Sequence, residues 1–139
     1  MPLWHVSHRQ RYGLRLWRTG AYSFRVIEPG EPADLLTNYD YVLFHRRYEG
    51  ALRTASTQIQ LTPVVVSDYV RGLEWRHYLE ATIRDEATAA EIWQPTAGES
   101  IIRRLGPENE VFVSGALKAD LQLVAGQKLL FSPGLSLFA

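Results

Sequence analysis

The stretch Gly72-Leu-Glu-Trp-Arg-His-Tyr-Leu-Glu-Ala-Thr-Ile83 shows the longest clean alternation of apolar and polar residues in the 139-residue sequence. Its odd-numbered positions are apolar or aromatic, with His77 among them, and its even-numbered positions are mostly charged or polar. A period of two predicts a β-strand with one face on a core and the other in water. We therefore expect a central strand here, with Trp75 and His77 on its inner face.

Shorter runs on both sides predict the rest of a β-sheet. Turn signals rich in glycine and proline separate these runs, as in sandwiches and barrels. Residues 34–38 fit a short turn or half-helix. Ser67 and Asp68 are expected to form a turn. Further strands are expected within residues 14–26 (a hairpin), 41–48, 51–66 (interrupted at Pro63), 100–105, 110–115, 117–124 and 128–132.

Residues 84–93 fit either a short helix or a turn followed by a strand. We favour turn and strand, because a short helix is marginal on its own. The predicted fold is all-β: an antiparallel β-sandwich or a closed β-barrel of about eight to ten short strands, with at most one short helix near residues 84–93. We expect a single domain over residues 1–139, with apolar tails at about residues 1–8 and 133–139.

The composition excludes several classes of site. The chain has no cysteine, which rules out disulfides, thiolate metal sites and cysteine nucleophiles. The formal net charge is zero and only Lys118 and Lys128 are lysines, so we do not expect nucleic-acid binding. No apolar run approaches the roughly 18 residues that span a bilayer, and no signal-peptide pattern is present. We expect synthesis in the cytoplasm and no membrane association.

Motifs of known catalytic chemistry are missing from the sequence. There is no Gly-x-Ser-x-Gly elbow, no phosphate loop and no dinucleotide fingerprint. His5 and His8 have a spacing that suits metal ligands on a helix, but an extended segment directs them to opposite faces. His77 fits a core histidine with one hydrogen-bond partner, or alternatively a general base working with a distant acid. We therefore predict no catalytic residue, metal or cofactor.

Binding signals concentrate at the ends of the chain. Residues 1–27 hold five arginines and two histidines but no acid. In the predicted hairpin Trp17 shares a face with Arg15, opposite Leu14 and Leu16, and an exposed tryptophan beside arginine is typical of a protein-binding hot spot or a stacking platform. The apolar ends either pack on the core or add as a strand to a neighbouring subunit. The candidate interface residues are Trp4, Arg15, Trp17, Arg18, Leu135, Leu137 and Phe138.

These features predict a non-enzymatic structural protein that self-associates or decorates a larger particle. Its partners would be proteins, most plausibly copies of itself or subunits of a capsid or tail. A virion component such as a capsid cement, neck or tail subunit matches the profile by analogy of composition. The alternatives are a lectin-like carbohydrate-binding β-sandwich, with a glycan as ligand, and a small β-barrel enzyme built around His77.

Overall fold

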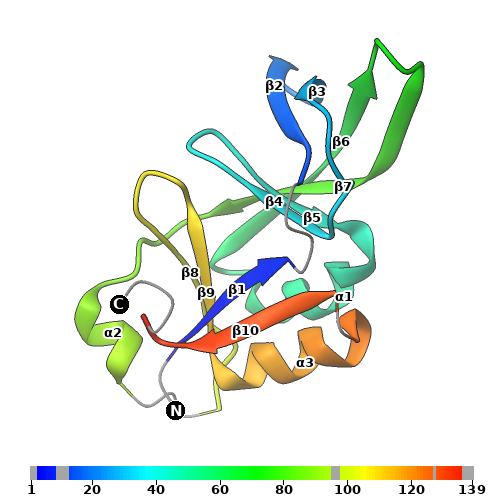
Figure 1. Ribbon diagram of the computed structural model, residues 1–139. Helices are drawn as coiled ribbons and strands as arrows, with labels where there is room; N and C mark the ends of the chain where they lie inside the picture. Colours follow the sequence, from blue (N-terminus) through cyan, green and yellow to red (C-terminus); the bar gives the residue numbers. More distant parts are fainter. Residues whose placement is uncertain (1–2, 9–12, 95–97, 127, 136–139) are drawn as a thin grey trace.

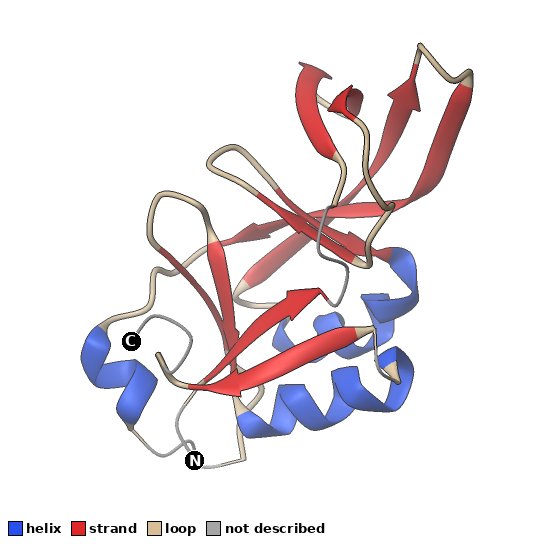
Figure 2. Ribbon diagram, in the orientation of Figure 1, coloured by secondary structure: helices blue, strands red, loops and turns tan. Residues whose placement is uncertain are grey.

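The structure, a computed structural model, describes residues 3–8, 13–94, 98–126 and 128–135, and it is mostly β (Figure 1). Within these residues ten strands form two sheets, one of six strands and one of four. Three α-helices and two short 3-10 turns complete the fold, and α3 runs beneath β10 (Figure 2). The predominance of short strands is confirmed, whereas the limit of one short helix is wrong.

The six-stranded sheet has the order β2-β3-β6-β7-β5-β4 and curls into a half-barrel (Figure 1). Its strands are β2 (Arg15–Gly20), β3 (Ser23–Glu28), β4 (Leu35–Thr37), β5 (Val42–His45), β6 (Ile59–Asp68) and β7 (Leu73–Ile83). The predicted hairpin of residues 14–26 is present as β2 and β3. The sheet is not purely antiparallel, because β3 and β6 run parallel. Residues 34–38, expected as a turn or half-helix, contain the strand β4.

Strand β7 is the predicted central strand, and it pairs with both β6 and β5. A β-bulge interrupts its pairing with β6, because Val64 lies opposite Tyr78 and Val66 lies opposite Trp75. The extra residue brings Trp75 and Tyr78 onto the same face, which is the usual effect of a bulge. Trp75 therefore packs against the concave core with Tyr78, and not on the face of His77 as the alternation predicted.

The four-stranded sheet has the order β10-β1-β9-β8 and is antiparallel throughout. Its strands are β1 (Trp4–His8), β8 (Ile102–Leu105), β9 (Glu110–Val113) and β10 (Leu129–Pro133). The chain termini thus meet in one sheet, since β1 lies between β10 and β9. The strands expected within residues 100–105, 110–115 and 128–132 are confirmed.

Two predicted strands are helices. Residues 117–124 belong to α3 (Gly115–Ala125), in which Ser114 caps the first turn by accepting the Leu117 N–H and in which Leu117, Leu121 and Ala125 are buried at four-residue spacing. Residues 84–93 contain α2 (Ala89–Trp93) instead of a return strand. Thr88 and Glu91 form a capping box at its start, and this Thr-x-x-Glu pattern was the overlooked signal.

The predicted strand over residues 51–66 begins only at Ile59. Before it, residues 46–55 form the turn η1 (Arg46–Tyr48), helix α1 (Glu49–Leu52) and the turn η2 (Arg53–Ala55). At its other end β6 continues through Ser67 and Asp68, which were expected to form a turn. Pro63 is tolerated inside β6 because β3 pairs with this strand only from Val65 onward, so the missing N–H falls beside an unpaired stretch.

The described residues form three buried clusters, of which the largest joins the two sheets. The largest lies between the sheets and includes Val6, Phe44, Ile83 and Leu121. A second cluster fills the concave side of the half-barrel, and a third lies beneath α2. Strand β5 is therefore buried on both faces, since Val42 and Phe44 lie in the first cluster and Leu43 in the second. Among the described residues no helix is both long and apolar enough to cross a membrane.

Candidate interaction surface

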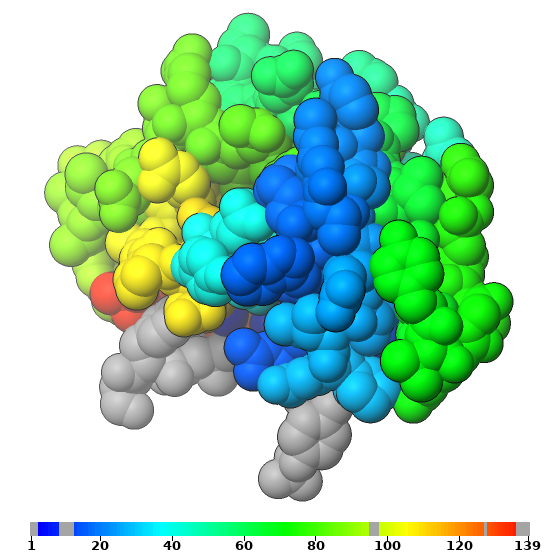
Figure 3. All heavy atoms as spheres, turned by 90° about the horizontal axis from the view of Figure 1, so that it is seen from above, coloured from blue at the N-terminus to red at the C-terminus, as the bar shows by residue number. Residues whose placement is uncertain are grey.

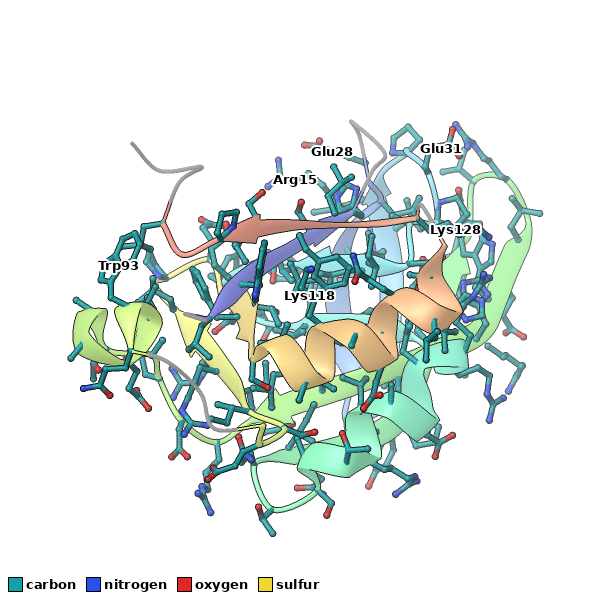
Figure 4. The ribbon with its side chains drawn as sticks, turned by 90° about the horizontal axis from the view of Figure 1, so that it is seen from below. Arg15, Glu28, Glu31, Trp93, Lys118 and Lys128 are labelled. Carbon is teal, nitrogen blue, oxygen red and sulfur yellow. The ribbon has the colours of Figure 1, made fainter. Side chains whose placement is uncertain are left out.

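Strand β2 separates its side chains cleanly between core and solvent. Leu14, just before the strand, and Leu16 are both 3% exposed and belong to the concave core, whereas Trp17 is 57% exposed. Arg15 is also exposed and pairs with Glu28 of β3 at 3.2 Å (Figure 4). The face on which Trp17 and Arg15 were predicted to lie is thus the outer face of the sheet.

Arg18 makes its contacts inside the chain. Its guanidinium donates to both oxygens of the Glu80 carboxylate, at 3.1 and 2.6 Å, and to Asp40 at 3.1 Å. It also lies 4.6 Å above the ring of Phe24. The hydrogen bonds to Glu80, followed by those to Asp40, raise the pKa of Arg18 above its usual value against the opposing effect of burial. Arg18 therefore ties β2 to β7 and to the turn between β4 and β5.

The outer edge of β2 is closed by other side chains and backbone of the same molecule. The Leu14 N–H donates to the Glu31 carbonyl at 3.0 Å, and the Leu16 N–H donates to the Tyr41 hydroxyl at 3.1 Å. Burial raises the pKa of Tyr41, so this phenol stays protonated at neutral pH. These contacts bring β2 close to the β4–β5 turn, although the two edge strands β2 and β4 do not pair.

A shallow pocket of about 120 Å³ lies at this junction. It is lined by Leu16, Trp17, Arg18 and residues 38–40, and Tyr39 at its rim is 66% exposed. Two exposed aromatic side chains therefore flank a small hollow with charged and amide groups at its base. Such an arrangement is suited to stacking on a planar or ring-shaped ligand.

The outer face of β2 and β3 carries the exposed side chains of Trp17, Arg25 and Ile27, and the neighbouring β6–β7 turn carries those of Tyr69 and Val70; we call these five residues the outer surface. Trp17 lies directly opposite Arg25, which in turn neighbours Ser67 of β6. Ile27 follows two residues beyond Arg25 and is 45% exposed, and Tyr69 follows two residues beyond Ser67. In the view from above, the β2–β3 hairpin and the end of the β6–β7 hairpin lie side by side (Figure 3).

The apolar end of the β6–β7 hairpin is held in a defined shape. Asp68 is only 3% exposed, and its Oδ1 accepts the N–H groups of Val70 and Arg71 at 3.2 and 3.1 Å. Gly72 completes the turn at φ +66°. Val70 is nevertheless 96% exposed and Tyr69 72% exposed. Sequence reasoning missed these residues, although two large apolar residues between a turn-forming Asp and Gly were a usable signal.

The other predicted interface residues lie away from Trp17. Trp4 is in β1, where the Lys118 ammonium sits 4.1 Å above its ring, and Leu135 packs against the cluster beneath α2. Leu137 and Phe138 fall outside the described residues. The structure therefore brings together Arg15, Trp17 and Arg18 on one strand, and it separates them from Trp4 and Leu135 in and after the other sheet.

His77, the alternative catalytic residue, stacks on His45 with ring centroids 4.5 Å apart and planes 19° apart. Burial lowers the pKa of both histidines, and for His45 burial together with the charges of Arg47 and His77 brings it to about 4. The nearby acid, Asp34, is 4% exposed and accepts the Tyr48 hydroxyl at 2.5 Å. His45 itself accepts the Arg47 N–H and so caps the turn η1. These contacts give the pair a packing and capping role.

His5, one of the two histidines with the spacing of metal ligands, contacts an acid and an aromatic ring. His5 bonds to Glu110 at 2.6 Å and packs on Phe112, with ring centroids 5.3 Å apart. Over the ranges that the structure describes, no group of three or more His, Asp or Glu side chains is placed to hold a metal ion.

Comparisons of the chain with models of protein families, with curated proteins and with solved structures find no match. Function is therefore inferred from the chain's own surfaces.

Proposed function

We propose that this protein is a non-enzymatic assembly protein that self-associates through its outer surface. The observation that carries the proposal is the row of exposed apolar and aromatic side chains on β2, β3 and the β6–β7 turn, from Trp17 through Ile27 to Tyr69 and Val70. Single exposed apolar residues are ordinary on protein surfaces, but a contiguous group is typical of an interaction site.

The composition of the outer surface supports a protein partner. Tryptophan, tyrosine and arginine are the residues most often found at interface hot spots. Arg25 is exposed between Trp17 and Ile27, and Arg71 lies at the turn. Because Asp68 fixes the turn, little conformational entropy is lost when Tyr69 and Val70 are buried.

The scaffold and setting are also part of the proposal. The two sheets that enclose a common core support a sandwich-like all-β scaffold for such a surface. We favour a virion as the setting, with the protein acting as a capsid cement, neck or tail subunit. The support for this setting is the small, cysteine-free, β-rich chain, which is an analogy of composition.

The test is the mass of the native chain by size-exclusion chromatography with light scattering over a range of concentrations. The wild type is expected to form an oligomer, and a Trp17→Ser/Val70→Ser variant a monomer. Tyr22→Ser is the matched control, since Tyr22 is 65% exposed in the β2–β3 turn and lies outside the outer surface. A wild-type monomer at every concentration, or an oligomer unchanged in the double variant, would overturn the proposal.

A second candidate is glycan binding at the pocket beside Trp17 and Tyr39. Exposed aromatic rings next to Asn38, Asp40 and Arg18 provide both a stacking surface and hydrogen-bonding groups for a sugar. The measurement is the shift in tryptophan fluorescence on adding mono- and oligosaccharides, with Trp17→Ala as the control. No shift at millimolar sugar, together with a silent glycan array, would eliminate this candidate.

A further inference from the structure

Strand β10 is the outermost strand of the four-stranded sheet, so one side of its backbone has no neighbouring strand. The Gly134 N–H donates to the Leu3 carbonyl at 2.8 Å, which makes Trp4 and Pro133 a non-hydrogen-bonded pair in the antiparallel ladder. The hydrogen-bonded pairs with β1 are then formed by Ser132 and Leu130. Leu129 and Phe131 consequently direct their N–H and C=O groups away from β1.

These outward groups of Leu129 and Phe131 have no hydrogen-bond partner within the described part of the chain. A row of unpaired N–H and C=O groups is a template for another strand. Pro133 has no N–H and limits the template at one end. Leu129 is only 3% exposed, so the accessible outward groups are those of Phe131, and the edge accommodates a short extended segment running beside Leu130 to Ser132.

A pocket of about 270 Å³ lies next to this edge, between β10 and α3. Its surface is polar and apolar in similar measure; the lining residues are Trp4, Lys118, Gln122, Gly126, Leu129, Leu130 and Phe131. Lys118 and Gln122 are one turn apart on α3 and so share a face. At the far end Gly126 has no side chain, and a Cβ added there would meet nothing within 4 Å.

The pocket carries a positive charge without a matching acid. The Lys118 ammonium lies 4.1 Å above the ring of Trp4 and 5.9 Å from that of Phe131, and the rings fix its position (Figure 4). Within the described ranges Lys118 forms no ion pair. Lys128, the second lysine of the chain, lies at the opposite end of β10 (Figure 4). The charge at Lys118 is thus available to a carboxylate from outside.

We propose that the groove between β10 and α3 binds an extended acidic–apolar segment of a partner protein, which adds as a strand to the edge of β10. Side chains two residues apart in such a strand point to the same face. The segment would place a carboxylate beside Phe131, facing Lys118, and a large apolar side chain two residues away, in the pocket near Gly126. Backbone hydrogen bonds supply affinity in this mode of recognition, and the pocket supplies sequence preference.

This inference concerns a different surface from the one proposed for self-association, and it does not depend on it. The outer surface lies on the six-stranded sheet, whereas the groove lies on the four-stranded sheet. A variant that removes one function is expected to leave the other intact. Peptide binding by the Trp17→Ser/Val70→Ser variant therefore separates the two proposals.

The experiment uses an array of end-blocked octapeptides probed with the full chain. One position carries Leu or Phe in a background of Thr and Val, and the position two residues along carries Glu, Gln or Lys. The Glu peptides are expected to bind best, with a loss of about fivefold for Gln, the usual value of one partly exposed charge pair. Methylating the peptide amides that face β10 is expected to abolish binding, because it removes the strand hydrogen bonds.

Lys118→Met and Lys128→Met form a matched pair of protein variants. Lys118→Met keeps the aliphatic stem over Trp4 and is expected to lose the preference for Glu over Gln, whereas Lys128→Met is expected to keep it. No peptide above background, no preference for Glu, or equal binding by N-methylated peptides would overturn the proposal. A dimer of the chain that buries β10 and excludes every peptide would also overturn it, in favour of a second copy as the occupant.

Discussion

Strands β2 and β10 are both edge strands, and the molecule treats them in opposite ways. The edge of β2 is closed by Glu31, Tyr41 and the Arg18 ion pairs, while the outward backbone groups of Phe131 in β10 have no hydrogen-bond partner in the described part of the chain. Charged side chains and the β4–β5 turn protect the edge of β2 against pairing with a strand of another molecule. The apolar edge of β10 remains open to such pairing. The arginine-rich strand β2 therefore stabilises the half-barrel through the ion pairs of Arg18. Among the described residues, the edge without hydrogen-bond partners belongs to β10, in the other sheet.

The largest expected effect is the loss of the closure at β2. Arg18→Ala leaves the carboxylate of Glu80, whose side chain is only 15% exposed, without its cation. We expect the free energy of unfolding to fall by about 3 kcal/mol, at the low end for breaking a buried pair because Arg18 is partly exposed. The measurement is urea unfolding followed by tryptophan fluorescence.

The control for this closure is Arg15→Ala on the same strand. Its ion pair with Glu28 is exposed on both sides, at 65% and 59%. Pairs of this kind contribute at most about 1 kcal/mol. Equal losses in the two variants would contradict the assignment of Arg18 as the residue that closes the edge.

A smaller effect is expected from Tyr41→Phe, which removes one hydroxyl group from the closed edge. The buried Leu16 N–H then loses its acceptor, and an unsatisfied buried donor costs about 2 kcal/mol. Tyr39→Phe is the control, because Tyr39 is 66% exposed at the rim of the neighbouring pocket. Chemical denaturation of both variants checks the difference, and a stable Tyr41→Phe protein would show that the edge is held without this bond.

Alternation of apolar and polar residues predicted the strands well where one face is buried and the other is exposed to solvent. The hairpin β2–β3 follows this pattern, and β7 follows it from Leu79 to Ile83, beyond the bulge. Helix α3 was missed because Leu117 and Leu121 also fit an alternating pattern, and the spacing of four becomes decisive only once the core on one side of the helix is known.

The candidate surface was only partly predictable. The exposure of Trp17 follows from local alternation, and the structure bears it out. The partners of Arg18 do not follow, because Glu80 is 62 residues away and is brought to β2 by the curl of the sheet. The bulge opposite Val65 likewise reversed the face of Trp75, since a single extra residue shifts every side chain before it.

On the side of the open edge, Gly134→Ala tests how β10 is anchored. Gly134 adopts φ +54°, and a Cβ there would come within 2.8 Å of the Trp93 ring. We expect a loss of about 1.5 kcal/mol from backbone strain and this contact, limited because Trp93 is half exposed and able to shift. Gly72→Ala is the control, since Gly72 has φ +66° but an open environment. Thermal unfolding of both variants separates backbone strain from the contact with Trp93. Equal losses of stability in the two variants would show that the contact with Trp93 contributes nothing.

The last expected effect is confined to low pH and lies near the start of β10, where Lys128 is close enough to lower the pKa of His45. Burial, then the charges of Arg47 and His77, bring that pKa to about 4 despite the opposing influence of Asp34. Between the ordinary value of 6.5 and about 4, the unfolded chain binds a proton at His45 that the folded chain does not. The free energy of unfolding must therefore fall as the pH is lowered through this window.

His45→Asn isolates this contribution, because asparagine is a good cap and retains an acceptor for the Arg47 N–H. Its free energy of unfolding is expected to fall less steeply than that of the wild type between pH 6.5 and 4, while carboxylates titrate equally in both. His77 remains in the variant and contributes in the same direction, since its pKa is also lowered by burial. Urea unfolding at several pH values gives the two slopes. Identical slopes would mean that His45 is protonated as readily in the folded protein as in the unfolded chain, and that its stack on His77 opens to water.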